Sequence, residues 1–254
     1  MLKSLLQKTL KTFGYEIKKI NPTINAAGVS IDMIEPEFFE IYNKCKPHST
    51  CTIEPMYSLF KSVEYIVKNN VKGDCVECGV FKGGSAMMIA LTLLHFKDTT
   101  RNIYLYDTFE GMAAPTKNDV DFDGNDAGNL LDNSIKEKDN IWCYSPIEEV
   151  KKNMESTGYD SEKIILIKGK VEDTIPNTTP QNIALLRLDT DWYESTHHEL
   201  IHLYPLLVKS GVLIIDDYGH WKGARKAVDD YFQNQEDKIL LNRIDYTVRA
   251  GVKG

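Results

Sequence analysis

The sequence lacks a long hydrophobic run. No stretch of the 254 residues is apolar for long enough to cross a bilayer, and no apolar signal-peptide core follows the first lysine. We therefore expect a cytoplasmic protein without stable membrane insertion. Positive charge is also scarce, since the chain has 30 lysines and arginines and 37 aspartates and glutamates. The formal net charge of −7 argues against nucleic acid as the main partner.

Cysteine is scarce and irregularly spaced. The five cysteines are an odd number and follow no disulfide framework, which predicts free thiols in a reducing compartment. Cys75 and Cys78 form a C-x-x-C pair, but the apolar alternation around them is typical of a strand. Because side chains alternate faces along a strand, this spacing places the two thiols on opposite faces. We favour buried strand cysteines over a metal or redox site.

From residue 56 onward the sequence alternates between strand and helix patterns. The expected strands lie at 74–80, 102–108, 163–169, 183–189 and 211–217, and the expected helices at 56–70, 84–96, 146–156, 193–207 and 221–235. This alternation predicts an α/β fold with a parallel sheet and helices on both faces. Residues 238–249 hold two short strand patterns without a crossover helix, which predicts a terminal antiparallel hairpin.

The first 55 residues differ from this core. One helical stripe within residues 1–20 carries the apolar side chains Leu2, Leu5, Leu6, Leu10 and Phe13. Such a helix is expected to pack on its own protein or on a partner in a homo-oligomer, with a membrane surface as the alternative. Residues 21–55 show no clear pattern. We expect residues 1–55 to form a helical or irregular N-terminal cap and residues 56–254 to form the main domain.

Acidic residues recur where the expected parallel strands end. The set comprises Glu77, Asp107, Glu172, Asp173, Asp189, Asp191, Asp216 and Asp217. In open α/β sheets, ligands bind beyond the carboxyl ends of the strands. Asp189 and the pair Asp216 and Asp217 end neighbouring strands and supply the hard oxygen ligands that suit Mg²⁺. A bound ion would also relieve the repulsion among these carboxylates.

Asp191 lies two residues beyond Asp189. If the strand alternation continues, both carboxylates project from the same side of the sheet. Asp191 is then placed to take a proton beside the ion without coordinating it. The alternative is a cap for the helix that follows.

A glycine turn follows the first expected strand. Gly79, Gly83 and Gly84, followed by Ser85, belong to the pattern E-x-G-x-x-x-G-G, in which Phe81 replaces the middle glycine of a dinucleotide fingerprint. Close approach of a diphosphate is therefore disfavoured. With Asp107 placed to accept hydrogen bonds from ribose hydroxyls, the pattern favours S-adenosylmethionine. Helix packing by the glycines and a helix cap by Asp107 are the alternatives.

Four stretches, VECGVFKGGSA, YLYDTFEGM, LLRLDTDWYEST and LIIDDYGHWKGARKAVDDYF, resemble the macrocin O-methyltransferase family of metal-dependent sugar O-methyltransferases from antibiotic biosynthesis. The resemblance implies a Rossmann-like class I methyltransferase fold with a mostly parallel seven-stranded sheet. It implies methyl transfer from S-adenosylmethionine to a sugar hydroxyl, with Mg²⁺ held by Asp189, Asp216 and Asp217 and with Asp191 as general base. The predicted cofactor-binding residues are Glu77, Gly79, Gly83, Ser85, Asp107, Glu172 and Asp173.

Two further motifs are typical of other functions. The HELIH sequence of His198–His202 matches a zinc-protease pattern, but Pro205 follows closely and the extended form of the motif is absent. Residues 114–128 begin like a calcium loop, yet Leu130 stands where the last ligand should be, so that a lid over the cleft or a solvated loop is favoured. A cofactor-binding protein that acts on a catechol-type acceptor, or as a non-catalytic partner, remains the main alternative.

Overall fold

The structure is a computed structural model that describes residues 35–236 and 238–254. Glu37–Gly254 forms one compact unit. The amphipathic helix expected in residues 1–20 lies outside the described residues and stays a prediction.

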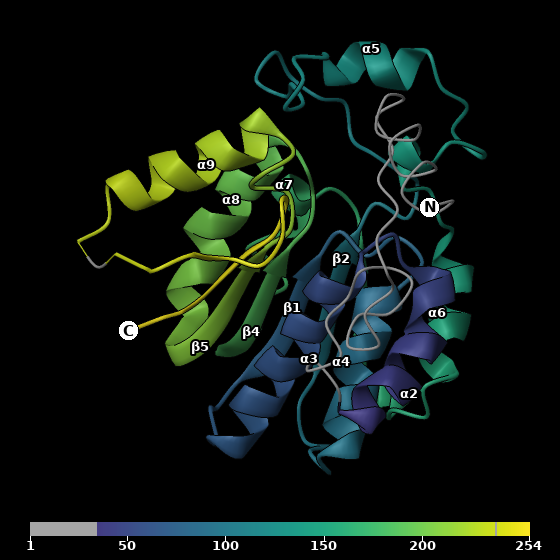
Figure 1. Cartoon of the computed structure of the whole chain (residues 1–254), viewed down its shortest axis with the longest axis vertical. Helices are drawn as coiled ribbons and strands as arrows, with labels where there is room; N and C mark the ends of the chain where they lie inside the picture. Colours follow the sequence, from purple (N-terminus) through teal and green to yellow (C-terminus); the bar gives the residue numbers. More distant parts are fainter. Residues whose placement is uncertain (1–34, 237) are drawn as a thin grey trace, which may run out of the picture. The chain divides into compact units, whose positions relative to one another are not determined.

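One sheet forms the centre of this unit (Figure 1). Its strands are β1 Asp74–Cys78, β2 Ile103–Asp107, β3 Ile164–Lys168, β4 Ile183–Leu188, β5 Leu207–Ile215, β6 Asn242–Arg243 and β7 Arg249–Val252. The seven strands lie in the order β3-β2-β1-β4-β5-β7-β6. β1 to β5 pair in parallel, whereas β7 pairs antiparallel with both β5 and β6. The predicted mostly parallel seven-stranded sheet with a C-terminal antiparallel hairpin is confirmed.

Helices cover both faces of the sheet (Figure 1). One face packs against α2 Pro36–Cys45, α3 Ile53–Lys68, α4 Gly84–His95 and α6 Ile147–Glu155. The other face packs against α7 Val171–Thr174, α8 Tyr193–Leu203 and α9 Lys222–Gln233. The remaining described helices are α5 Ala127–Asp132 and the short 3-10 turns η1 Lys46–His48, η2 Asn140–Trp142, η3 Ser161–Lys163 and η4 Tyr204–Leu206.

The two cysteines of the C-x-x-C pair lie in separate cores. Cys75 packs in the core on the α3 and α4 side, and Cys78 packs in the core on the α8 side. Both side chains are fully buried, and the thiols are free. Burial raises the pKa of both thiols, which makes reactive thiolates unfavourable. The prediction of buried strand cysteines on opposite faces is confirmed.

Two segments differ from the expected pattern. Helix α2 lies where the sequence showed no clear pattern, although its buried residues Phe38, Ile41, Tyr42 and Cys45 have helical spacing. This apolar stripe spans little more than two turns, which makes it a weak periodic signal. Helix α8 ends at Leu203 instead of residue 207, because Pro205 has no N–H for the helical ladder and the chain continues as η4.

Candidate active site

Two adjoining cavities lie at the carboxyl ends of the parallel strands. The smaller, of about 170 Å³, is lined by the turn after β1, by Asp107 at the end of β2 and by Asp189 after β4. The larger, of about 510 Å³, is lined by loops around residues 50–52, 140–143, 220–221 and 245–247. We call the smaller the cofactor cavity and the larger the acceptor cavity, after the ligands that we propose for them. Both are lined by Asp191, Asp216 and Asp217, so that these carboxylates lie where the cavities meet.

The structure brings together the three aspartates predicted to bind metal. Asp189, Asp216 and Asp217 each offer an oxygen within 4.8 Å of the others. The backbone fixes two of them, because the Asp189 N–H donates to the Cys78 carbonyl at 2.8 Å and the Asp216 N–H donates to the Leu188 carbonyl at 2.9 Å. Asp217 Oδ2 is buried without a hydrogen-bond partner. Three converging carboxylates, one of which has an unpartnered buried oxygen, fit the coordination preference of Mg²⁺.

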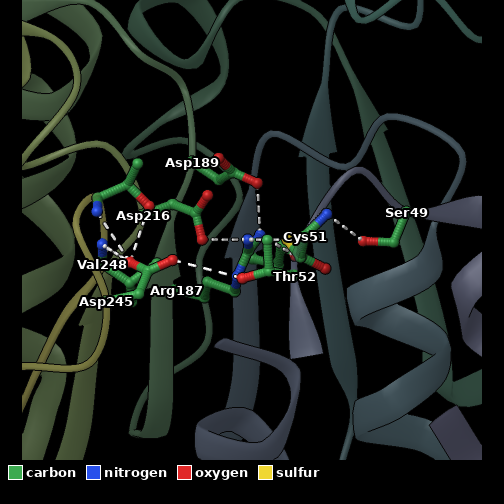
Figure 2. Close-up of polar contacts among 10 residues, drawn as sticks. Ser49, Cys51, Thr52, Arg187, Asp189, Asp216, Asp245 and Val248 are labelled. Carbon is green, nitrogen blue, oxygen red and sulfur yellow. Dashed lines mark hydrogen bonds and ion pairs between the residues drawn. The ribbon is translucent and has the colours of Figure 1, made fainter. Parts of the chain in front are cut away.

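A buried arginine forms ion pairs with two of these aspartates. Arg187 Nη1 contacts Glu77 Oε1 and Asp189 Oδ2, both at 2.6 Å, and Arg187 Nη2 contacts Asp216 Oδ1 at 2.5 Å. Figure 2 shows the guanidinium of Arg187 between Asp189 and Asp216, beside Cys51. The sequence interpretation missed Arg187, although a single arginine inside the apolar run LLRLD was a usable signal. Two residues before Asp189, it projects to the same side of β4.

The carboxylates where the cavities meet are hard to ionise together. Burial raises the pKa of Asp189 well above its usual value, while Arg187 opposes this rise and Asp216 adds to it. Burial also raises the pKa of Asp217, with further contributions from Asp191 and Asp216. For Asp191, burial and then the charge of Asp189 raise the pKa to about 7. The cluster therefore holds more negative charge than one guanidinium balances, which favours a bound cation or proton.

Asp191 does not reach the cleft by strand alternation. β4 ends at Leu188, and Asp191 has a left-handed backbone with φ of 67°. The expectation that Asp189 and Asp191 share one face of an extended strand is therefore wrong. A left-handed aspartate is uncommon, and here the turn carries the side chain into both cavities.

Three of the predicted cofactor-binding residues line the cofactor cavity: Gly79, Asp107 and Glu172. Gly79 has φ of 82°, and a Cβ there would lie 1.8 Å from the Asp189 carbonyl oxygen, so that only glycine fits. Asp107 Oδ2 accepts hydrogen bonds from the backbone N–H groups of Val80 (2.7 Å) and Phe81 (3.1 Å), while its Oδ1 accepts from that of Phe109 (2.7 Å). Asp107 thus shapes the glycine turn in addition to facing the cavity.

The other four predicted cofactor-binding residues lie outside the cavity lining. Glu77 is fully buried against Arg187, and Ser85 is buried beside it at the start of α4. Gly83 caps α4 in a left-handed conformation with φ of 85°. Asp173 is exposed in the first turn of α7. The structure therefore brings Glu77 to the base of the metal-competent cluster instead of the cofactor cavity.

Hydrogen bonds join the acidic loop before α5 to the first residues of α8 and α9, where Tyr193 donates to Asp119 and Lys222 donates to the Val120 carbonyl. Asp119 is fully buried and accepts hydrogen bonds from the N–H groups of Thr116 (2.6 Å) and Tyr193 (2.8 Å). Asp121 accepts hydrogen bonds from the backbone N–H and the side-chain amide of Asn125, each at 2.8 Å. Both aspartates therefore hold the loop itself, as structural aspartates do in turns. The suggested lid function of this loop stays a prediction.

The HELIH residues have structural partners instead. His198 Nε2 lies 2.9 Å from the Ile175 carbonyl, and the Thr190 hydroxyl donates to the buried Glu199 at 2.9 Å. Within residues 35–236 and 238–254, the one group of three or more His, Cys, Asp or Glu side chains that could hold a metal ion is Asp189 with Asp216 and Asp217. The zinc-protease and calcium-loop interpretations therefore gain no support from the described part of the chain.

The fold and the comparisons with known proteins define a class I O-methyltransferase. The family model of macrocin O-methyltransferase (TylF) matches residues 47–250, and the chain belongs to this family. The resemblance and the enzyme class expected from the sequence are thus confirmed. Among the described residues, no helix combines the length and the apolar character that crossing a membrane requires.

Similar proteins are named as O-methyltransferases. Demethyldecarbamoylnovobiocin O-methyltransferase of Streptomyces niveus is 30% identical over 199 residues, which cover 77% of this chain and 73% of that enzyme. A tetracenomycin rhamnosyl 4'-O-methyltransferase of Streptomyces olivaceus is 33% identical over 200 residues, covering 79% and 73%, respectively. The solved structure of the O-methyltransferase NovP matches with a TM-score of 0.70 at 26% identity, covering 98% of this chain and 97% of that one.

Proposed function

We propose that this protein transfers a methyl group from S-adenosylmethionine to a hydroxyl of a sugar and that it requires Mg²⁺. The observation that carries the proposal is the meeting of two cavities at Asp191, Asp216 and Asp217. A donor in one cavity and an acceptor in the other would face each other across these carboxylates. Holding two reactants in this way converts a bimolecular step into an effectively unimolecular one.

The cofactor cavity suits an adenosine without a diphosphate. Its floor is the turn from Gly79 to Phe81, whose N–H groups at Val80 and Phe81 already donate to Asp107. Those donors are therefore not free to bind phosphate oxygens, in contrast to the turn of a dinucleotide site. Asp107 and Glu172 offer acceptor oxygens to ribose hydroxyls and to a cationic ligand.

The metal-competent aspartates and Asp191 divide the acid–base work. When bound, Mg²⁺ supplies Lewis acidity that makes a nearby hydroxyl easier to deprotonate. Asp189, Asp216 and Asp217 would hold the ion, while Asp191 accepts the hydroxyl proton on a carboxylate oxygen. The acceptor oxygen then forms a bond to the methyl carbon as the carbon–sulfur bond breaks, and the electron pair of that bond stays on sulfur. General base catalysis of this kind contributes about 10²- to 10⁴-fold.

The wall of the acceptor cavity favours an uncharged glycoside. Its described residues include four aspartates, Asp191, Asp216, Asp217 and Asp245, and no lysine or arginine. Even with Mg²⁺ held by Asp216 and Asp217, the charges of Asp191 and Asp245 would remain, and a nucleotide diphosphate would find no lysine or arginine partner in this lining. Trp192, Trp221 and Tyr246 supply apolar surface, as small-molecule sites commonly do. Among natural-product, surface-glycan and nucleotide-sugar acceptors, we therefore propose the uncharged glycosides first.

Calorimetry with S-adenosylmethionine, S-adenosylhomocysteine and Mg²⁺ tests both half-sites. We expect Asp107→Ala to weaken cofactor binding and Asp189→Ala to remove the Mg²⁺ signal. Because Asp189 also lines the cofactor cavity, Asp189→Ala should weaken cofactor binding too, but less than Asp107→Ala does. Asp160→Ala, at an exposed aspartate outside both cavity linings, is the matched control. No binding of either cofactor form would overturn the proposal. Neutral glycosides and nucleotide sugars, compared as methyl acceptors, then decide the acceptor class.

Three expectations from the sequence remain proposals. The boundary between an N-terminal cap of residues 1–55 and a methyltransferase domain of residues 56–254 is one of them. Association into a homo-oligomer through the N-terminal segment and a location in the cytoplasm are the others. Limited proteolysis, light scattering and cell fractionation, respectively, test them.

A further inference from the structure

We infer that Arg187 sets the ion preference of the aspartate cluster, because it restricts Asp189 and Asp216 to one coordinating oxygen each. The inference rests on the proposed Mg²⁺ site and deepens it. Arg187 is not proposed to touch the substrate or the methyl donor. It acts through the two carboxylates and is therefore a positioning residue.

The contacts of Arg187 engage one oxygen of each carboxylate. Nη1 lies 2.6 Å from Asp189 Oδ2, and Nη2 lies 2.5 Å from Asp216 Oδ1 (Figure 2). The guanidinium does not engage Asp189 Oδ1 or Asp216 Oδ2 in these contacts, and these are the oxygens that would coordinate an ion. A bidentate carboxylate would have to bring its second oxygen to the ion as well, away from the guanidinium. Charge-assisted hydrogen bonds this short resist that rotation.

The guanidinium itself has no room to move aside. Arg187 is 2% exposed and lies on β4, between β1 and β5 in the sheet. Glu77, on β1, holds Nη1 at 2.6 Å, and Cys51 Sγ lies 3.4 Å from Nη2. Glu77 is fully buried, and a separation from Arg187 would leave a buried charge without a partner, which is strongly destabilising. Arg187 therefore stays in place whether or not an ion is bound.

One oxygen per carboxylate affects two common divalent ions differently. Mg²⁺ takes six ligands at about 2.0–2.1 Å and usually keeps several waters, whereas Ca²⁺ takes six to eight oxygens at about 2.3–2.6 Å and often uses bidentate carboxylates. Monodentate aspartates satisfy the first ion and leave the second short of protein ligands. The positive charge of Arg187 weakens the binding of both ions, whereas the blocked oxygens act mainly against Ca²⁺.

The test measures the ratio of the Ca²⁺ and Mg²⁺ dissociation constants by calorimetry, on the full chain without acceptor. Arg187→Met is combined with Glu77→Gln, because Glu77 is fully buried and would otherwise keep an unpaired charge, whereas Asp189 and Asp216 are left to the ion. We expect the preference to shift toward Ca²⁺ by about tenfold or more as the carboxylates become free to bind in bidentate fashion. Infrared carboxylate bands with Ca²⁺ bound should report the same change in coordination.

Arg187→Lys is the second variant, which keeps the buried charge and spares Glu77. A lysine ammonium lacks the planar fork and cannot hold two carboxylates in fixed orientations, so that a smaller shift toward Ca²⁺ is expected. This variant carries the test if the double variant fails to fold. Arg101→Met with Asp98→Asn is the matched control, since it removes another buried arginine and its carboxylate partner at 2.7 Å. The control should leave the ion ratio unchanged.

The outcomes separate this inference from the proposed function. If the wild type binds Mg²⁺ and the ratio stays within twofold in the folded Arg187 variants, the role of Arg187 is overturned and the metal site stands. If the wild type binds no Mg²⁺, the metal part of the proposed function is overturned and the inference falls with it. An equal shift in the Arg101 control would show a general effect of buried charge and would also overturn the inference.

Discussion

The cofactor cavity and the acceptor cavity are built from different kinds of structure. The cofactor cavity is formed by turns that directly follow parallel strands, and backbone hydrogen bonds hold them. Asp107 accepts three such bonds, and the Asp189 N–H continues the ladder of β1 and β4. The acceptor cavity is instead assembled from the loops near residues 50–52, 140–143, 220–221 and 245–247.

The cofactor cavity depends on the fold, whereas the acceptor cavity depends on loops that are particular to this chain. In open α/β sheets ligands bind beyond the carboxyl ends of the strands, so that the position of the cofactor cavity follows from the sheet. Loops far apart in the sequence can change one at a time without disturbing the sheet. The carboxylates shared by both cavities link the two halves. Variants on either side should therefore have separable effects, and a variant at the shared wall should affect the chemical step.

The largest effect is expected from Asp191→Asn. The amide cannot accept the hydroxyl proton, and we expect kcat to fall by about 10²- to 10⁴-fold. Affinities for Mg²⁺ and S-adenosylhomocysteine should change little, because the proposed ion ligands and the glycine turn are intact. Single-turnover assays and calorimetry measure the two sides. A loss of less than tenfold in kcat would remove Asp191 as general base.

The same residue predicts the acid limb of the rate. In the metal-free protein, burial and then the charge of Asp189 raise the pKa of Asp191 to about 7. A protonated Asp191 carboxyl cannot accept another proton, so that the rate of the Mg²⁺-loaded enzyme should fall in a pH–rate profile as the pH drops through the pKa of Asp191 in that state. A bound cation moves this limb to lower pH.

An intermediate effect is expected from Asp107→Asn, on the cofactor side alone. The amide would place a donor against one of the backbone N–H groups that Asp107 now accepts from. A hydrogen bond to a charged group contributes about 1.5–3 kcal/mol, so that the dissociation constant for S-adenosylhomocysteine should rise by about 10- to 100-fold. Asp160→Asn is the control, since Asp160 also accepts a backbone hydrogen bond, from Glu162 at 3.0 Å, but in an exposed turn. Unchanged calorimetry for Asp107→Asn would contradict the assigned role of this turn.

The smallest effect is expected from Tyr246→Ala, on the acceptor side alone. Tyr246 is 53% exposed, lines the acceptor cavity and has its ring 6.1 Å from that of His220. Loss of an aromatic contact of about 0.5–1.5 kcal/mol should raise KM for a neutral glycoside about two- to tenfold, with cofactor affinity unchanged. Leu240→Ala, at an exposed apolar residue outside the lining of either cavity, is the control in steady-state kinetics. A change in cofactor affinity without a change in KM would contradict the division of the cleft.

Much of the fold could be predicted because its signals are local. Each of these signals can be recognised within a few residues: the alternation of strand and helix patterns, the glycines after β1, and the aspartates at the end of β2 and after β4 and β5. The opposite faces of Cys75 and Cys78 follow from strand geometry alone. Helix α2 escaped notice because a stripe of a few apolar residues resembles chance spacing. The end of α8 at Leu203 shows that one proline outweighs a continuing apolar pattern.

Which residues contact one another in the site was harder to predict from the sequence. The sequence predicts that Glu77 binds the cofactor, whereas the structure shows Glu77 paired with Arg187 and outside the lining of the cofactor cavity, so that its cofactor role stays a prediction. That pairing joins residues on two strands that are far apart in the sequence, and only the parallel register of β1 and β4 makes them neighbours. The left-handed turn at Asp191 could not be predicted from the sequence either, because the turn contains no glycine or proline.

The amino-acid sequence by itself determined the class of fold, the strand ends that carry function and the acidic character of the cleft. These depend on hydrophobic periodicity and on residue type, which are properties of short segments. The tertiary structure alone decided that Arg187 lies among Glu77, Asp189 and Asp216, and that Asp191 belongs to both cavities. The physical reason is that a buried charge takes its partners from whichever strands pack around it, and that neighbourhood exists only once the sheet has formed.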